Sequence, residues 1–173
     1  MQESRKIYSP LFSPMIQDQL EFEEGKRNNV YYDSKGILTG GIGHNYQTQP
    51  NWPDSGTPLP HTLTDAECYK LLGLDLLHTE KYLKSYWDHY SKMQAGPRKD
   101  AILAMSFQLG VVSFMGFTNF RMQVEHGHWE DAAKAGLASK WAKEDSPDRA
   151  ARVMRQLTTG KYYEVPPKHS EEK

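Results

Sequence analysis

Residues 13–44, SPMIQDQLEFEEGKRNNVYYDSKGILTGGIGH, are the part of the chain most informative about its fold. It begins with Ser13, a preferred N-cap residue, followed by Pro14 at the first helical position. Apolar residues then recur at helical spacing, and Gly25 is typical of the position just beyond a helix. These signals predict a helix over residues 14–24 whose last turn carries two glutamates.

Residues that favour β-structure follow this helix. Residues 30–32 and 37–39 are β-prone, and residues 33–36 between them begin with Asp and end with Gly, as type I turns do. The glycine-rich residues 40–44 predict a third strand, in which the glycines allow backbone to approach backbone closely. The region therefore predicts a small antiparallel hairpin or a three-stranded sheet.

The rest of the chain is mainly helical, so the predicted fold class is α+β. Residues 64–67 form a capping box that opens a long helix reaching about Tyr90, and Gly96-Pro97 opens another that stops at Gly110. Three more helices are expected near the C-terminus. We expect one domain over residues 1–173, with a cleft between its lobes as the default place for a ligand. Its parts are an N-terminal lobe (13–63), a connecting helix (64–90), a helical lobe (91–163) and loose termini (1–12 and 164–173).

The composition excludes several classes of protein. The chain has 173 residues with 21 Lys and Arg against 22 Asp and Glu, a balance that argues against a nucleic-acid-binding protein. A single cysteine, Cys68, excludes an intramolecular disulfide, and no apolar run approaches the roughly 20 residues that span a membrane. Residues 1–15 hold no apolar stretch typical of a secretory signal peptide, so we expect none. His126 and His128 have no obvious further ligands, which favours surface histidines over a metal site.

Two carboxylates in the opening segment form a candidate catalytic pair. Glu24 lies at the predicted helix end, where the negative pole of the macrodipole disfavours its anion by about 0.3–1 kcal/mol. Asp33 begins a turn, where local hydrogen bonds favour the ionised form. Glycosidic cleavage requires such a pair of one neutral acid and one ionised carboxylate. Both residues are also common at these positions for structural reasons, so the spacing alone leaves a structural role open.

Three arginines recur on one face of the last predicted helix. Arg149, Arg152 and Arg155 are three residues apart. The stripe is either a solvated basic face or a bridge to the acidic helix end at Glu23 and Glu24, and the spacing supports both interpretations equally.

The stretch from Glu24 to His44 resembles the active-site block of the T-even phage lysozyme family, glycoside hydrolase family 24. The shared pattern is Glu-Gly, seven residues, Asp, two residues, Gly, two residues, Thr, and a closing Gly-Ile-Gly-His. The resemblance extends over residues 14–163 and implies a lysozyme-like fold. The further similar segments are residues 105–110, 116–119, 129–133, 146–153 and 159–160.

The resemblance implies specific catalytic and structural roles. Glu24 is expected to protonate the leaving oxygen, Asp33 to steer the attacking water, and Thr39 to hold that water. The family inverts the anomeric centre, so carboxyl groups about 6.5–9.5 Å apart are expected. No metal or organic cofactor is implied, because two carboxylates and water suffice. The expected structural ion pairs are Arg149 with Glu24, Arg152 with Glu23, and His44 with Asp75.

The resemblance also places residues along a glycan-binding cleft. Asn45, Phe107, Gln108, Phe120 and Ala135 fall at cleft-lining positions. Tyr31, Phe107 and Gln108 are expected to contact the glycan, although Phe107 fits a plain core role equally well.

The expected function is a muramidase that cleaves the β-1,4 bond between N-acetylmuramic acid and N-acetylglucosamine in peptidoglycan. Alternatives are a lytic transglycosylase on the same glycan, or a non-catalytic wall-binding part of a phage or secretion machine. We expect a monomer that stays in the host bacterial cytoplasm until released, for example through a holin pore, and then acts on the cell wall. We expect no stable membrane insertion.

Overall fold

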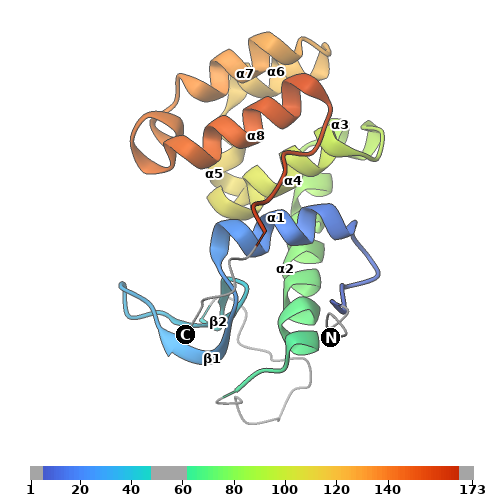
Figure 1. Ribbon diagram of the computed structural model, residues 1–173. Helices are drawn as coiled ribbons and strands as arrows, with labels where there is room; N and C mark the ends of the chain where they lie inside the picture. The colour runs from blue at the N-terminus through green and yellow to red at the C-terminus, as the bar shows by residue number, and fades with distance from the viewer. Residues whose placement is uncertain (1–5, 48–61, 168–173) are drawn as a thin grey trace.

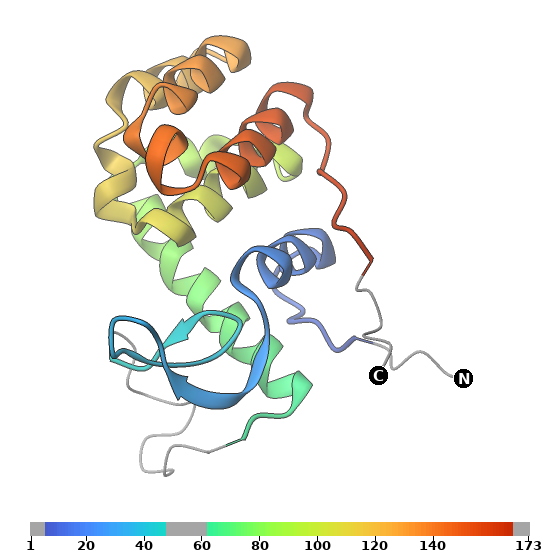
Figure 2. The ribbon, with the colours of Figure 1, turned by 60° about the vertical axis from the view of Figure 1, so that its left-hand side comes forward.

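The computed structural model describes residues 6–47 and 62–167 and has two lobes joined by a long helix (Figure 1). Helix α1 (Pro14–Glu24) and the sheet β1 (Arg27–Tyr32), β2 (Leu38–Gly41) and β3 (His44–Asn45) form the N-terminal lobe with the start of α2 (Asp65–Tyr86). Figure 2 shows α2 running from this lobe into the helical lobe. The remaining elements are α3 (Asp88–Lys92), α4 (Pro97–Leu109), α5 (Val111–Met115), α6 (Thr118–Glu125), α7 (Trp129–Leu137), the π-helical turn η1 (Trp141–Asp145) and α8 (Pro147–Thr159). The α+β class is confirmed.

Helix α1 has the predicted bounds. The Ser13 hydroxyl accepts a hydrogen bond from the Ile16 amide at 3.3 Å. Gly25 closes the helix at φ 75°, a conformation that favours glycine, and its amide donates to the Glu21 carbonyl at 2.9 Å. This ending fixes where the Glu24 side chain leaves the helix.

The sheet is antiparallel in the order β1-β2-β3, but the predicted third strand at residues 40–44 is wrong. Gly40 and Gly41 complete β2, and the third strand is only His44–Asn45. The reason is a tight turn: Gly41 and Gly43 adopt φ of 60° and 68° and reverse the chain where a continuous strand was expected.

The connecting helix α2 starts as predicted and ends earlier. Thr64 and Glu67 form both halves of the capping box, with side chain-to-amide distances of 3.2 Å and 2.9 Å. The helix stops at Tyr86 because Trp87 adopts an extended conformation, φ −141° and ψ 93°. Its indole is buried in the helical lobe and donates to Glu125 Oε1 at 2.6 Å. The expected helix over 64–90 is therefore broken into α2 and α3.

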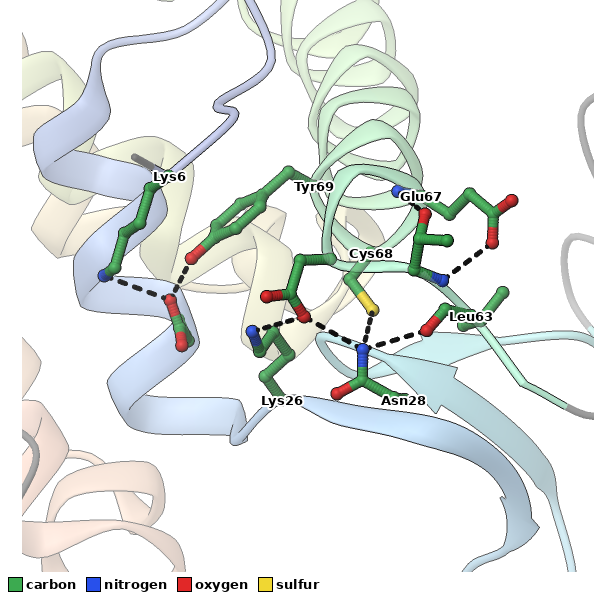
Figure 3. Close-up of polar contacts among 10 residues, drawn as sticks. Lys6, Lys26, Asn28, Leu63, Glu67, Cys68 and Tyr69 are labelled. Atoms are coloured by element: carbon green, nitrogen blue, oxygen red, sulfur yellow. Dashed lines mark hydrogen bonds and ion pairs between the residues drawn. The ribbon is translucent and has the colours of Figure 1, made fainter. Parts of the chain in front are cut away.

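Polar contacts fasten the start of α2 to β1 (Figure 3). The Asn28 amide donates to the Leu63 carbonyl and to Asp65 Oδ1, both at 2.9 Å. Lys26 Nζ lies 2.8 Å from the same Asp65 oxygen. These contacts hold the sheet against the helix that connects the lobes.

Polar contacts attach segment 6–12 to α1, while Ile7 and Leu11 stay exposed at 64% and 61%. These contacts favour an ordered segment over the loose extension expected for residues 1–12. The Ser9 amide donates to Gln17 Oε1 at 2.8 Å, and Gln17 Nε2 donates back to the Ser9 carbonyl at 3.0 Å. Lys6 Nζ lies 2.6 Å from Asp18 Oδ1. It also lies 3.3 Å from Glu21 Oε2, and the Tyr69 hydroxyl donates to the same Glu21 oxygen (Figure 3). Buried backbone groups need such partners. The remaining termini, 1–5 and 168–173, and the loop segment 48–61 lie outside the described residues.

None of the helices within the described ranges is long and apolar enough to cross a membrane.

Candidate active site

A cleft of about 310 Å³ lies where the two lobes meet. Its walls come from the end of α1, the β2–β3 turn, α2, α4 and α8. The lining residues are Glu24, Gly43, Asn45, Asp75, Thr79, Phe107, Gln108 and Arg149. A larger cavity of about 440 Å³ lies around Trp129 in the helical lobe, and none of the predicted site residues lines it.

Glu24 projects into this cleft from the last position of α1. Its Oε1 accepts a hydrogen bond from Arg149 Nη1 at 2.6 Å, across the two lobes. The Glu24 side chain is 25% exposed, so solvent still reaches it. The Arg149 side chain is only 9% exposed and is nearly buried. The pair places an ionisable carboxyl in the cleft with a fixed direction.

Gly43 packs directly against Glu24, a contact that sequence reasoning missed. A Cβ at position 43 would lie 3.2 Å from Glu24 Cβ and 3.3 Å from its Oε2, and the residue has φ 68°. Both the space and the backbone therefore favour glycine. The Gly-Ile-Gly-His motif was the signal available for this role.

The arginine stripe bridges the lobes at two of its three positions. Besides the Arg149 contact, Arg152 holds Glu23 with two hydrogen bonds, Nε to Oε1 at 2.7 Å and Nη2 to Oε2 at 3.0 Å. The hydrogen bond to Glu23 raises the pKa of the Arg152 guanidinium further. Arg155 is exposed. The bridging interpretation holds for the first two arginines and the solvated one for the third.

Asp33 opens the β1–β2 turn, and backbone amides orient its carboxylate. Oδ1 accepts from the amides of Lys35 at 2.8 Å and Ile37 at 2.9 Å. The Gly36 amide also donates to the Asp33 carbonyl at 2.9 Å. Asp33 and Thr39 are not among the residues that line the 310 Å³ cleft.

Three predicted site residues form one row across the sheet. Tyr31 on β1 is opposite Thr39 on β2, which is opposite Asn45 on β3. Directly opposed residues of antiparallel strands share a face, so this row leads from the cleft at Asn45 toward β1. Thr39 is buried and its hydroxyl donates to the Ile37 carbonyl at 3.0 Å, which leaves the oxygen able to accept. The Arg27 guanidinium lies 4.3 Å from the centre of the Tyr31 ring.

His44 and Asp75 form a buried pair beneath the cleft. His44 Nδ1 is 2.9 Å from both Asp75 carboxyl oxygens, and the Tyr46 ring packs edge-on against the imidazole. Burial raises the pKa of the Asp75 carboxyl, and the hydrogen bond with His44 acts in the opposite direction. Asp75 also lines the cleft, as does Thr79 one turn further along α2. Thr79 was missed, although its spacing of four residues from Asp75 places it on the same helix face.

The helical lobe contributes Phe107 and Gln108 to the cleft. The Gln108 amide is fixed at both ends, since Nε2 donates to Ser146 Oγ at 2.8 Å and Oε1 accepts from the Trp141 indole at 3.0 Å. Phe107 is half-buried and lines the cleft.

Phe120 does not line the cleft, and its assignment to substrate binding is wrong. It is 1% exposed and packs edge-on against Phe114 and Phe117. Its position on α6 faces the core of the helical lobe, where an aromatic ring buries a large apolar area.

No cluster of three or more His, Cys, Asp or Glu side chains suited to a metal occurs within residues 6–47 and 62–167. His126 and His128 stack with ring centres 5.7 Å apart, and their Nδ1 atoms pair with the Met122 carbonyl and with Gln123.

The small sheet lobe, the connecting helix and the cleft carboxyl together define a lysozyme-like protein. Comparison with known families makes this specific: the model of the family described as phage lysozyme matches residues 21–161, and the chain belongs to that family. The family supports a glycoside hydrolase that acts on peptidoglycan.

Individual relatives come from phages and from a eukaryote. The chain is 34% identical over 134 residues to the endolysin of Salmonella phage P22, and this match covers 75% of this chain and 83% of the endolysin. It is 27% identical over 164 residues to the probable T4-type lysozyme 1 of Dictyostelium discoideum, with 84% and 94% covered. It is also 31% identical over 158 residues to the pre-baseplate central spike protein Gp5 of Enterobacteria phage T4. That match covers 83% of this chain but only 27% of the spike protein.

Proposed function

We propose that this protein is a muramidase that hydrolyses the β-1,4 bond between N-acetylmuramic acid and N-acetylglucosamine with inversion. The single observation that carries the proposal is the Glu24 carboxyl, held in the inter-lobe cleft by Arg149 at 2.6 Å while a quarter of its side chain stays exposed. Membership of the phage lysozyme family supports the substrate class.

In this proposal Glu24 is the general acid. It donates its proton to the bridging oxygen as the bond to the anomeric carbon breaks, so that the leaving sugar departs as a neutral alcohol. Arg149 stabilises the carboxylate that remains and keeps it aimed at the same point. The exposed part of Glu24 allows it to take up a proton from solvent for the next turnover.

Asp33 and Thr39 act on the water. The two amides that hold Asp33 Oδ1 orient its carboxylate, and the ionised carboxylate accepts a proton from the attacking water. Thr39 holds the same water through its hydroxyl oxygen. The water attacks the face of the sugar ring opposite the departing oxygen, so one displacement inverts the centre.

Asn45, Phe107 and Gln108 position the glycan in the cleft, and Tyr31 extends the contact along the sheet. The fixed amide of Gln108 presents a preorganised polar edge to the sugar.

Two other functions use parts of this site. A lytic transglycosylase needs the acid but no water-steering carboxylate, so the oriented Asp33 favours hydrolysis. A non-catalytic part of a larger machine is suggested by the name of the central spike relative, but such a part has no need of an oriented acid in the cleft. We further propose a monomer that is stored in the bacterial cytoplasm and reaches the wall through a holin pore.

Clearing of permeabilised Gram-negative cells tests catalysis against mere wall binding. The protein should clear the suspension, Glu24→Gln should not, and Glu130→Gln, a change of the same kind at an exposed site on α7, should clear it as the parent does. Wall binding by the parent without clearing would contradict the proposal.

A further inference from the structure

An aromatic ladder leads away from the cleft along α2. It consists of His78, Tyr82 and Tyr86, each four residues from the next and so on one face of the helix. The His78 and Tyr82 rings are 4.7 Å apart, and the Tyr82 and Tyr86 rings are 6.3 Å apart and within 16° of parallel. All three side chains are exposed, Tyr82 by 42% and Tyr86 by 57%.

The ladder forms one wall of a groove of about 270 Å³, whose other walls come from α4 and α5. Thr79 and Phe107 line both this groove and the catalytic cleft, so the two are continuous. A polymer that lies in the cleft and leaves it past Thr79 therefore reaches the ladder next.

The chemistry of the groove fits neutral sugar rings. None of the nine described residues that line it is Asp, Glu, Lys or Arg, so His78 is the one lining side chain that can carry a positive charge beside a peptide stem. An aromatic face carries partial negative charge and attracts the C–H bonds on the apolar face of a pyranose. The eight residue steps from His78 to Tyr86 rise about 12 Å along the helix, enough for about two such rings.

We propose that the ladder is an accessory platform for the glycan strand, which binds sugar rings beyond those that span Glu24. This inference rests on the proposed muramidase function and names a binding site outside the cleft. A merely structural role predicts something different, because aromatic neighbours four residues apart stabilise a helix without needing a ligand.

The test compares the double variant Tyr82→Ala/Tyr86→Ala with Lys81→Ala/Ser85→Ala, which changes two exposed residues of the same helix outside the ladder. Substrates are long glycan strands freed of peptide, the same strands with peptide stems, and a short oligosaccharide that fills only the cleft. We expect KM for long peptide-free strands to rise about five- to tenfold in the ladder variant, with kcat unchanged. The short substrate should be cleaved as by the parent. Tyr82→Phe/Tyr86→Phe, which keeps the rings, should restore KM.

Glycan binding can be measured without cleavage in a variant that lacks the acid. In the Glu24→Gln background, the dissociation constant for peptide-free strands should also rise about five- to tenfold when the two tyrosines become alanine. Unchanged KM and unchanged binding, or an effect confined to strands that carry peptides, would overturn the platform. A parent protein that cleaves nothing but binds strands through the ladder would refute the proposed function and leave the platform supported.

Discussion

At the scale of single residues, Gly43 controls the space available to Glu24. Gly43→Ala combines strain at φ 68° with a contact of 3.2 Å to Glu24 Cβ. We expect a loss of about 1–3 kcal/mol in unfolding free energy and a fall of at least about tenfold in kcat, because the acid must move. Urea unfolding and sacculus hydrolysis measure the two effects. Gly127→Ala is the control, since its φ is 69° with no atom within 4 Å of the added Cβ. Equal loss of activity in both variants would remove the special role of Gly43.

Asp33 can be changed without disturbing the turn that holds it. In Asp33→Asn the side-chain oxygen still accepts hydrogen bonds from the Lys35 and Ile37 amides. The unfolding free energy of this variant should therefore stay within about 0.5 kcal/mol of that of the parent. The amide cannot accept a proton from water, so kcat should fall by about 100-fold or more. Near-normal activity in a correctly folded variant would show that another group steers the water.

The buried hydroxyl of Tyr46 should affect the stability of the protein at alkaline pH. Burial raises the pKa of Tyr46 to about 12, and its hydroxyl is buried without a hydrogen-bond partner among the described residues. The unfolded chain releases this proton near pH 10, whereas the folded protein keeps it to about pH 12. The stability that Tyr46 gives by keeping its proton is therefore fully present below pH 10 and is lost as the pH rises toward 12. In Tyr46→Phe the unfolding free energy should fall less steeply over this interval, by up to about 1.4 kcal/mol per pH unit. Parallel urea titrations of both proteins give the comparison, and identical slopes would contradict it.

At the scale of elements, α8 clamps α1 and so places the acid. Arg152→Ala leaves the Glu23 side chain, 6% exposed, without its bidentate partner. We expect a loss of about 1–3 kcal/mol in unfolding free energy. Arg155→Ala, on the same helix but exposed, should change it by less than about 0.5 kcal/mol. Similar losses of unfolding free energy in the two variants would mean that the contact between Arg152 and Glu23 adds nothing to stability.

Which elements the sequence predicts depends on how local their signals are. The cap at Ser13 and the capping box at Thr64 act within one helical turn, and both helices begin where those residues indicate. The end of α2 depends instead on burial of Trp87 in the helical lobe, a tertiary contact that leaves no pattern in a short window of sequence. The third strand was placed wrongly because glycines allow both an extended strand and a positive-φ turn, and the structure has the turn at Gly41 and Gly43.

At the scale of the whole molecule, the two lobes bring together residues that are far apart in the chain. The spacing of the arginines allowed both a solvated and a bridging role, and only the packed structure distinguishes Arg152 from Arg155. Phe120 shows the converse, because the position that the resemblance placed in the cleft is turned into the core of the helical lobe. For Gly43 and Thr79 the sequence offers a motif and a helical spacing, but their place in the cleft follows from the packing of the β2–β3 turn against Glu24 and of α2 against α4.

Mass spectrometry of the muropeptides released from purified sacculi in heavy-oxygen water tests whether Glu24 is the acid of a hydrolysis. If Glu24 protonates the leaving oxygen while water attacks, the parent protein should release products whose new reducing ends carry the heavy oxygen, and Glu24→Gln should release none. Anhydro-sugar products without the label, or labelled products from Glu24→Gln, would contradict the account.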